Sequence, residues 1–123
     1  MTQKKQLQII RGQILSGQNL GKETGARTAN LALSLAKNLP NGLYTCTVIW
    51  QNLQYSGLLY HGYNSLSQKD CLEVHILNFS QDIYGQEIAI TIKNFIRPEI
   101  KFNNLQELKN QIKKDLTDAK KLF

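Results

Sequence analysis

The sequence predicts a small, mainly β protein, an antiparallel barrel of five or six strands with one α-helix packed outside. Several segments alternate apolar and polar residues with a period of two, which is typical of half-buried strands. Short turn sequences separate these segments, and only the C-terminal stretch has the apolar spacing of a helix. The length of 123 residues suits one domain, so we expect a single domain over residues 1–123.

The N-terminal third combines one strand with glycine-rich turns. Residues 7–16 have the pattern of a first strand, and Gly12 within it suggests a bend or a close backbone approach. Residues 17–30 are rich in glycine and polar residues, so we expect a loop there. Residues 31–39 suit a short strand or one helical turn, and the Pro-Asn-Gly sequence at 40–42 is typical of a turn.

Four further strands are expected before the C-terminal helix. β-branched and aromatic residues favour a strand over residues 43–51, and a second strand follows over residues 54–63. Residues 71–79 and 86–96 alternate most regularly, with a turn at 82–85 between them. One face of these two strands is expected to carry Leu72, Val74, Ile76, Ile88, Ile90 and Ile92.

The C-terminal segment has the pattern of an amphipathic helix. Asn104 is a suitable N-cap and Glu107, three residues later, can complete a capping box. Lys120 and Lys121 in the last turn suit the helix dipole. The expected apolar face carries Leu105, Leu108, Ile112, Leu116, Ala119 and Leu122.

Composition excludes several classes of protein. No apolar run approaches the roughly 18–20 residues that cross a bilayer, and the first residues lack the apolar stretch of a secretory signal. We therefore expect a soluble cytoplasmic protein without a membrane partner. Cys46 and Cys71 have no CxxC spacing and lie in apolar segments, which favours reduced core thiols over a metal or redox site.

The formal net charge of +6 is concentrated at the two ends of the chain. Basic residues there can attract a polyanion such as nucleic acid or ATP, and they equally suit a solvated surface. Proteins that bind single-stranded nucleic acid place aromatic residues beside basic ones. Trp50, Tyr55, Tyr60 and Tyr63 lack such neighbours in the sequence, so no nucleic-acid partner is expected.

Residues 17–30 contain the first candidate site. Its glycines expose backbone N–H groups that can cradle phosphates, and Lys22 adds a positive charge, although the spacing is not that of a Walker loop. These glycines are Gly17, Gly21 and Gly25. If the chain is extended at Thr28 and Asn30, both side chains point to one side, and their neutral oxygens suit Mg²⁺. A surface turn of polar residues is the alternative interpretation.

The second candidate site is Glu73, a carboxylate in an otherwise apolar strand. Such a group must face water, pair with a cation or line a pocket. In a pocket, it can accept the proton of a hydroxyl group that attacks a phosphate. His75 on the same side of the strand is the competing base, but a single strand histidine is more often structural, and the same holds for His61.

These short motifs follow one another in a specific order. The glycine-rich loop precedes Thr-Ala-Asn at 28–30, and Leu-Glu-Val-His follows at 72–75. Arg-Pro-Glu at 97–99 and the terminal helix end the series. The combination resembles the riboflavin kinase family over residues 8–122.

The resemblance implies a six-stranded Greek-key barrel that transfers the γ-phosphate of ATP to the 5′-hydroxyl of riboflavin, giving FMN and ADP. Thr28 and Asn30 match the family's ligands of Mg²⁺ and the ATP phosphates, and Glu73 matches its base. Arg97 and Asn64 match residues near the substrates. The family's nucleotide-covering loop matches Gly17, Gly21, Lys22 and Gly25. We expect a monomer that uses ATP with Mg²⁺ or another divalent metal.

The chain departs from the family pattern at Arg27, where the family has proline. Losing a proline costs about 0.4–1 kcal/mol of preorganisation. Arg27 either offsets this loss by contacting phosphate or marks a decayed site. The alternative function is therefore a non-catalytic flavin- or nucleotide-binding barrel with a degenerate metal loop. The length leaves no room for the adenylyltransferase that bacterial relatives carry, so FAD synthesis is not expected.

Overall fold

The computed structural model describes residues 8–18, 26–65 and 67–122. Within these ranges, strand segments form one antiparallel sheet in the order β1-β7-β4-β5-β6-β3-β2. The strands are β1 (Ile9–Gln13), β2 (Ser16–Gln18), β3 (Ala26–Leu31), β4 (Gly42–Trp50), β5 (Leu53–Asn64), β6 (Lys69–Leu77) and β7 (Glu87–Arg97). A 3₁₀-helix, η2, spans Leu33–Ala36, and the helix α1 spans Leu105–Lys120.

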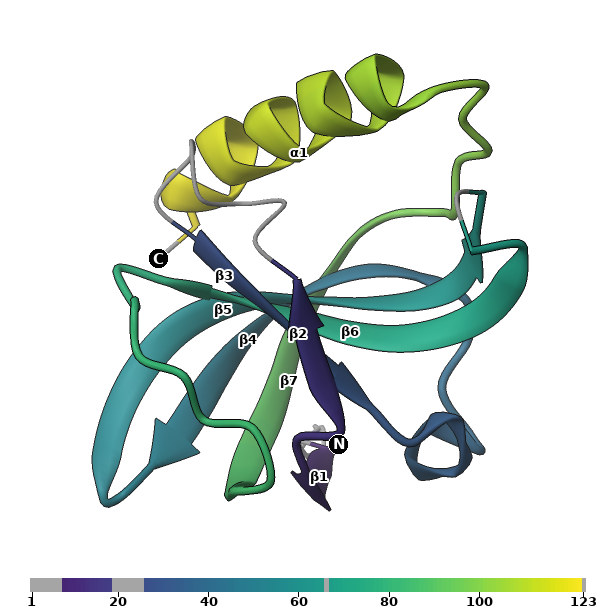
Figure 1. Cartoon of the computed structure of the whole chain (residues 1–123). Coiled ribbons are helices and arrows are strands. Elements are labelled where there is room, and N and C mark those ends of the chain that lie inside the picture. Colours follow the sequence, from purple (N-terminus) through teal and green to yellow (C-terminus); the bar gives the residue numbers. More distant parts are fainter. Residues whose placement is uncertain (1–7, 19–25, 66, 123) are drawn as a thin grey trace, which may run out of the picture.

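β1 and β2 are two halves of one bent strand. β1 pairs with β7, whereas β2 pairs with β3 at the other edge of the sheet. Ile14 and Leu15 join the halves, and their N–H groups donate to the carbonyls of Gln86 (2.9 Å) and Asn30 (2.8 Å). The sheet therefore curls into a half-barrel of six described strands, counting the bent one once, as expected (Figure 1).

The strand order also contains a Greek key. β4, β5 and β6 are consecutive neighbours, and β7 returns to pair with β4. The resulting order, β7-β4-β5-β6, is the one that defines this motif. A two-residue turn at Gln51 and Asn52, with φ of 50° and 64°, joins β4 to β5. Positive φ at both positions gives the twist that suits a tight hairpin.

The inner face of the sheet forms the main core. The alternation expected in β6 and β7 is confirmed, because the six predicted residues are all buried there: Leu72, Val74, Ile76, Ile88, Ile90 and Ile92. Gly12 in β1 also has the close contact that its position suggested. A Cβ added at Gly12 would meet the Cδ1 atom of Leu35 in η2.

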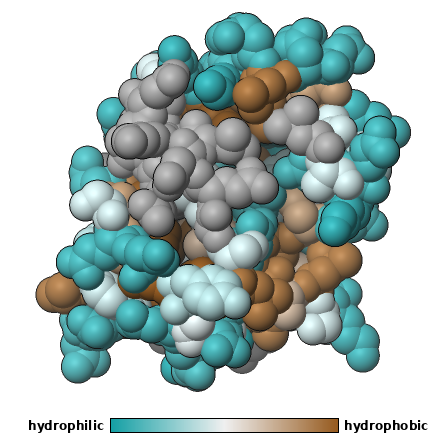
Figure 2. Space-filling view, in the orientation of Figure 1, coloured by the Kyte–Doolittle hydropathy of each residue, from teal (hydrophilic) through white to brown (hydrophobic). Residues whose placement is uncertain are grey.

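The helix α1 lies along the outer face of the sheet (Figure 1) and builds a second, smaller core with it. Buried residues of this core are Leu43, Leu58 and Leu77 from the strands and Ile112, Leu116 and Ala119 from the helix. Polar side chains predominate along the upper border of Figure 2, the region that α1 occupies in Figure 1. No helix in the described ranges is both long and apolar enough to cross a membrane.

The ends of α1 differ partly from expectation. The N-cap is confirmed: Asn104 Oδ1 accepts from the backbone N–H of Glu107 at 2.9 Å. Glu107 Oε1 in turn accepts from the N–H of Asn103 at 3.1 Å, rather than from that of Asn104. Leu105 and Leu122 are 41% and 54% exposed, so the buried apolar face is shorter than predicted. Both lie at the limits of the helix, outside the group that contacts the sheet.

The loop predicted over residues 17–30 was too long. β2 and β3 occupy both ends of that segment, and only residues 19–25 of it lie outside the described part. β3 pairs with β6 from residue 26 to residue 31. These backbone hydrogen bonds between strands distant in sequence outweigh the local preference of polar residues for a loop. For residues 31–39, the helical turn is confirmed by η2.

Gly57 provides a test of packing between β5 and β6. A Cβ at this position would lie 2.9 Å from the carbonyl oxygen of His75 and 3.2 Å from Val48. Gly57→Ala is therefore expected to lower the free energy of unfolding by about 1–3 kcal/mol, because the backbone must shift. Urea denaturation measures this loss. Ser56→Ala is the neighbouring control, and equal stability of Gly57→Ala and the parent protein would contradict the packing argument.

The two cysteines occupy different environments. Both are free thiols, as predicted. Cys46 is 1% exposed in the main core, and burial raises the pKa of its thiol to about 12. Cys71 is only half-buried, so its predicted place in the core is wrong. Burial raises the pKa of Cys71 as well, with a further increase from the nearby Glu73 carboxylate.

These raised pKa values predict a loss of stability in alkali. The folded protein keeps the Cys46 thiol protonated, whereas the unfolded chain releases this proton above the ordinary thiol pKa of 9.0. A raised folded-state pKa contributes stability below pH 9 that is lost as the pH rises toward 12. Urea midpoints measured from pH 7 upward should fall beyond about pH 9. Cys46→Val should flatten this decline, and an unchanged slope would contradict the assignment.

Candidate active site

One row of side chains crosses five strands on the outer face of the sheet. Asn30 in β3 is opposite Glu73 in β6, which is opposite Tyr60 in β5. Tyr60 is opposite Leu43 in β4, and Leu43 is opposite Arg97 in β7. Directly opposed residues share a face, with Cβ atoms about 4.5–5.5 Å apart. Three residues selected from the sequence thus lie in one row, with Glu73 beside Asn30 and Arg97 three strands beyond.

A second row runs beside the first. Thr28 in β3 is opposite His75 in β6, and His75 is opposite Leu58 in β5. The Thr28 Oγ1 and His75 Nδ1 atoms are 2.9 Å apart and share a hydrogen bond. Thr28 and His75 are only 1% and 6% exposed. Thr28 and Asn30 therefore point to the same side of an extended strand. This is the arrangement that the sequence analysis expected if both side chains belong to one site.

A pocket lies between these rows and α1. Its volume is about 610 Å³, including the part open to solvent. The lining residues are Leu43, Leu58, Tyr60, Tyr63, Asn64, Ser65, Glu73, His75, Arg97, Phe102, Leu108, Ile112 and Asp115. Thr28 and Asn30 lie one strand beyond Glu73 and His75, outside this lining. Glu73 and His75 consequently lie between the pocket and the two neutral oxygen donors, with Glu73 opposite Asn30 and His75 opposite Thr28.

A residue at the end of the neighbouring strand β5 holds the Glu73 side chain in place. The residue is 9% exposed, and Asn64 Nδ2 donates to its Oε1 atom at 3.1 Å. Asn64 Oδ1 accepts from the backbone N–H of Ser67, also at 3.1 Å, which orients the amide. The Glu73 carboxylate is therefore positioned in the pocket wall rather than free to rotate in solvent.

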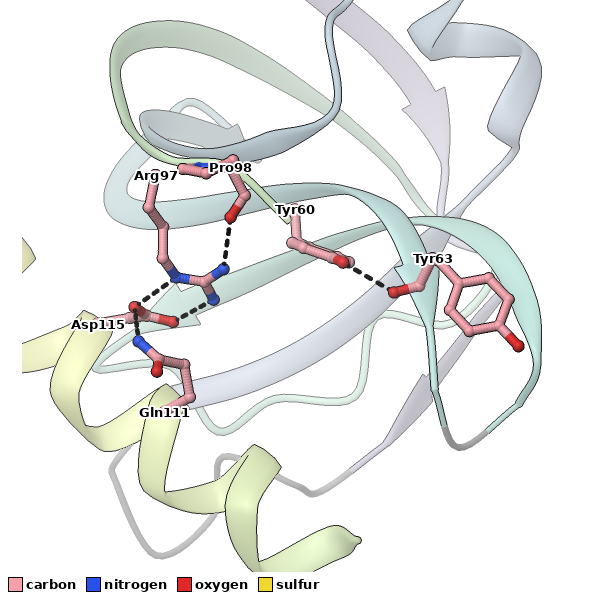
Figure 3. Close-up of polar contacts among 6 residues, drawn as sticks. All are labelled: Tyr60, Tyr63, Arg97, Pro98, Gln111 and Asp115. Atoms are coloured by element: carbon pink, nitrogen blue, oxygen red, sulfur yellow. Dashed lines mark hydrogen bonds and ion pairs between the residues drawn. The ribbon is translucent and has the colours of Figure 1, made fainter. Parts of the chain in front are cut away.

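Arg97 forms an ion pair with the helix (Figure 3). Its Nε and Nη2 atoms donate to the two carboxylate oxygens of Asp115 at 2.9 and 2.7 Å, and Nη1 donates to the Pro98 carbonyl at 3.0 Å. Gln111 Nε2 donates to the same carboxylate at 3.0 Å. Sequence analysis missed Asp115, although an acidic residue beside Leu116 on the apolar side of the helix was an available signal.

The segment after β7 is fastened to the end of β5. Glu99 Oε2 accepts from the backbone N–H of Tyr63 at 2.9 Å, and Asn41 Nδ2 donates to its Oε1 at 3.4 Å. The bond from Tyr63 is the main reason that the pKa of Glu99 is lowered. The backbone N–H of Phe102 donates to Ser65 Oγ at 2.8 Å. These contacts hold Phe102 as a wall of the pocket.

Burial shifts the pKa of two other pocket groups in the direction that favours their uncharged forms. Desolvation lowers the pKa of His75, against the opposing effect of the Glu73 and Asp115 carboxylates. Desolvation also raises the pKa of Tyr60, whose hydroxyl donates to the Tyr63 carbonyl at 2.8 Å (Figure 3). Tyr60 was not selected as a site residue, because its place beside Glu73 depends on the pairing of β5 with β6.

The sequence analysis also selected the glycine-rich loop as a candidate site and noted Arg27 as a departure from the family pattern. Gly17 lies in β2 opposite Ala29. Arg27 lies in β3 opposite Ile76, so the strand pairs regularly where the family pattern has proline. The other members of the glycine-rich loop lie outside the described residues: Gly21, Lys22 and Gly25.

The oxygen donors on β3 suit a hard cation that brings most of its own ligands. Within the described ranges, no cluster of three or more His, Cys, Asp or Glu side chains could enclose a metal. Mg²⁺ is typically held by one or two protein oxygens together with water and phosphate. Asn30 Nδ2 donates to Ser16 Oγ at 2.9 Å, so this hydrogen bond does not use the Asn30 oxygen, Oδ1. The donor chemistry of Thr28 and Asn30 therefore fits Mg²⁺.

The fold is a half-barrel that a helix closes on one side, with a pocket between the two. The family model described as "Riboflavin kinase" (Flavokinase) matches residues 5–123. The chain therefore belongs to the riboflavin kinase family, as the order of its motifs predicted.

Curated relatives agree with this family. The chain is 36% identical to the trifunctional protein RibF/MnmA of Mycoplasmoides gallisepticum, over 93% of the chain and 18% of that protein. It is also 36% identical to the bifunctional riboflavin kinase/FMN adenylyltransferase of Haemophilus influenzae, over 93% of the chain and 38% of that protein. The chain thus spans well under half of these relatives.

The riboflavin kinase structure from Trypanosoma brucei has the same fold. It superimposes with a TM-score of 0.62 over 93% of this chain and 78% of that one, at 22% identity.

Proposed function

We propose that this chain is a riboflavin kinase domain that transfers the γ-phosphate of ATP to the 5′-hydroxyl of riboflavin. One observation carries this proposal: Glu73 lies between an apolar pocket on one side and the Thr28 and Asn30 oxygens on the other. A phosphoryl transfer needs such an order, with the acceptor, the base and the phosphate-binding groups in line. Membership of the riboflavin kinase family supports this choice of substrates.

The pocket suits the flavin as the acceptor. Its wall combines aromatic and aliphatic side chains with a few polar groups, the lining that favours a flat heteroaromatic ring. With the ring between the sheet and α1, the ribityl chain extends toward Glu73. Arg97 would contact the flavin from the far end of the row, in the orientation that Asp115 imposes on its guanidinium.

Glu73 acts as the general base in this proposal. Its carboxylate accepts the proton of the 5′-hydroxyl while that oxygen forms a bond to the γ-phosphorus and the bond to the ADP oxygen breaks. The products are FMN, ADP and one proton. Asn64 holds the carboxylate through the 3.1 Å hydrogen bond to Oε1, and the Cys71 thiol is a second hydrogen-bond partner of the same carboxylate.

Thr28 and Asn30 would hold Mg²⁺ together with the ATP phosphates. The cation supplies charge neutralisation for the transferring phosphoryl group. The glycine-rich loop remains the proposed cover of the nucleotide, through Gly17, Gly21, Lys22 and Gly25. We also propose that the domain acts as a cytoplasmic monomer without nucleic-acid or membrane partners.

A coupled assay of ADP formation tests the proposal. We expect ADP release that requires both riboflavin and Mg²⁺, with FMN as the second product. Riboflavin binding without ADP release under any divalent metal would instead favour the alternative, a non-catalytic flavin-binding barrel. Arg27 in the metal loop is the observation behind that alternative, so activity restored by Arg27→Pro would locate the defect there.

A further inference from the structure

His75 has a buried hydrogen bond that the proposed reaction does not use. Its Nδ1 atom lies 2.9 Å from Oγ1 of Thr28, and the two residues are directly opposed on β6 and β3. Both are almost completely buried, at 6% and 1% exposure. Water therefore competes little for this hydrogen bond, and the partner of the Thr28 hydroxyl is set by the fold.

The direction of this hydrogen bond decides what Thr28 can do. A hydroxyl has one proton to donate and lone pairs to accept, whereas a neutral imidazole has one donor and one acceptor nitrogen. If Nδ1 carries the proton, the ring donates to Oγ1 and occupies a lone pair. If Nε2 carries it, Oγ1 donates to Nδ1 and its lone pairs remain for a cation.

Asn30, the other proposed metal ligand on β3, also has a hydrogen bond to a neighbouring side chain. Ser16 Oγ accepts from Asn30 Nδ2 at 2.9 Å, a hydrogen bond that does not use the Asn30 oxygen. Each proposed metal ligand on β3 therefore has one neighbouring side chain that can orient it. Such partners of metal ligands commonly tune affinity, and their removal costs about 10–100-fold in binding.

We propose that His75 is a positioning residue: its ring carries the proton at Nε2, accepts a hydrogen bond from the Thr28 hydroxyl at Nδ1, and aims the Thr28 oxygen at the metal–nucleotide complex. This inference rests on the proposed function, because the cation is expected with ATP. It gives the histidine of the Glu-x-His sequence a role separate from the base. Glu73 handles the substrate proton, and His75 orients a ligand one strand away.

The two histidines of the chain allow a direct test of the tautomer. His61 Nδ1 lies 2.7 Å from the carbonyl oxygen of Leu39, which can only accept, so His61 carries its proton at Nδ1. The ¹⁵N shifts of the imidazole nitrogens distinguish the two tautomers. We expect opposite patterns in the full chain at mildly alkaline pH, with Nδ1–H in His61 and Nε2–H in His75. An Nδ1–H signal from His75 would overturn the proposal, and this measurement needs no variant.

Binding of Mn²⁺–ADP, followed by electron paramagnetic resonance of the metal, provides the second test. His75→Leu keeps the volume but removes the acceptor and should weaken this binding by about 10–100-fold. His75→Asn puts an amide oxygen near the Nδ1 position and should recover most of the affinity. Far-UV circular dichroism, recorded for both variants, reports that they are folded.

The outcomes separate this inference from the proposed function. If the parent protein does not bind Mn²⁺–ADP, the metal assignment fails, and the role of His75 fails with it. If the parent protein binds it and His75→Leu binds it equally well, only the positioning role is wrong. Weaker binding in His75→Leu together with recovery in His75→Asn supports the role, because a general loss of packing would affect both variants.

Discussion

Glu73→Gln is expected to lower kcat by about 10²–10⁴-fold, the usual effect of losing a positioned general base. The amide has nearly the same shape as the carboxylate but cannot take the proton of the 5′-hydroxyl. Riboflavin binding should change little, since the pocket wall keeps its shape. The measurement is the steady-state rate of ADP formation, with binding of riboflavin followed separately by fluorescence.

A matched control is available in β7. Glu87 is an exposed carboxylate at the start of that strand, remote from the Asn30–Arg97 row, and Glu87→Gln should leave kcat unchanged. If Glu73→Gln turns over like the parent protein, the assignment of the base is wrong. An equal loss in both variants would indicate a general effect of charge rather than a specific proton acceptor.

Asp115→Ala is expected to lower the free energy of unfolding by about 3–5 kcal/mol, the cost of breaking a buried ion pair from one side. The Arg97 and Asp115 side chains are 17% and 6% exposed, so solvent screens the remaining charge poorly. Removal of the carboxylate leaves the guanidinium in the pocket wall without its bidentate partner. Urea denaturation with an unchanged m-value measures the loss.

Two further variants identify the cause. Asp118→Ala removes an exposed carboxylate from the same helix and should cost less than about 0.5 kcal/mol. The double variant Arg97→Met/Asp115→Leu replaces both charges and should recover most of the stability, since no unpaired charge remains. A single Asp115→Ala variant as stable as Asp118→Ala would contradict a structural role of the ion pair.

The strands and the helix could be predicted where local pattern and tertiary environment agree. β6 and β7 alternate in sequence because one face packs in the core, and α1 has its cap and apolar spacing within one segment. β3 could not be found this way. Its polar residues favour a loop locally, and its extended form depends on pairing with β6, more than forty residues away.

The same distinction holds for the candidate site, where some residues could be selected from the sequence and others could not. Thr28, Asn30 and Glu73 could be selected because their residue types and order match a family pattern. Nothing local indicated that Asn64 would hold Glu73, or that Tyr60 would lie between Glu73 and Leu43. Register between strands decides those contacts, and a shift of one residue would turn each side chain to the other face.

The amino-acid sequence by itself determined the class of fold and the family, and it supplied the proposed base and oxygen donors, because these depend on periodicity and on short motifs. Only the tertiary structure decided that Asn30, Glu73 and Arg97 share one row. It also decided that Arg97 forms an ion pair with Asp115 and that His75 contacts Thr28. These relations join strands and a helix that are far apart in the chain. They follow from sheet register and packing, which no local pattern encodes.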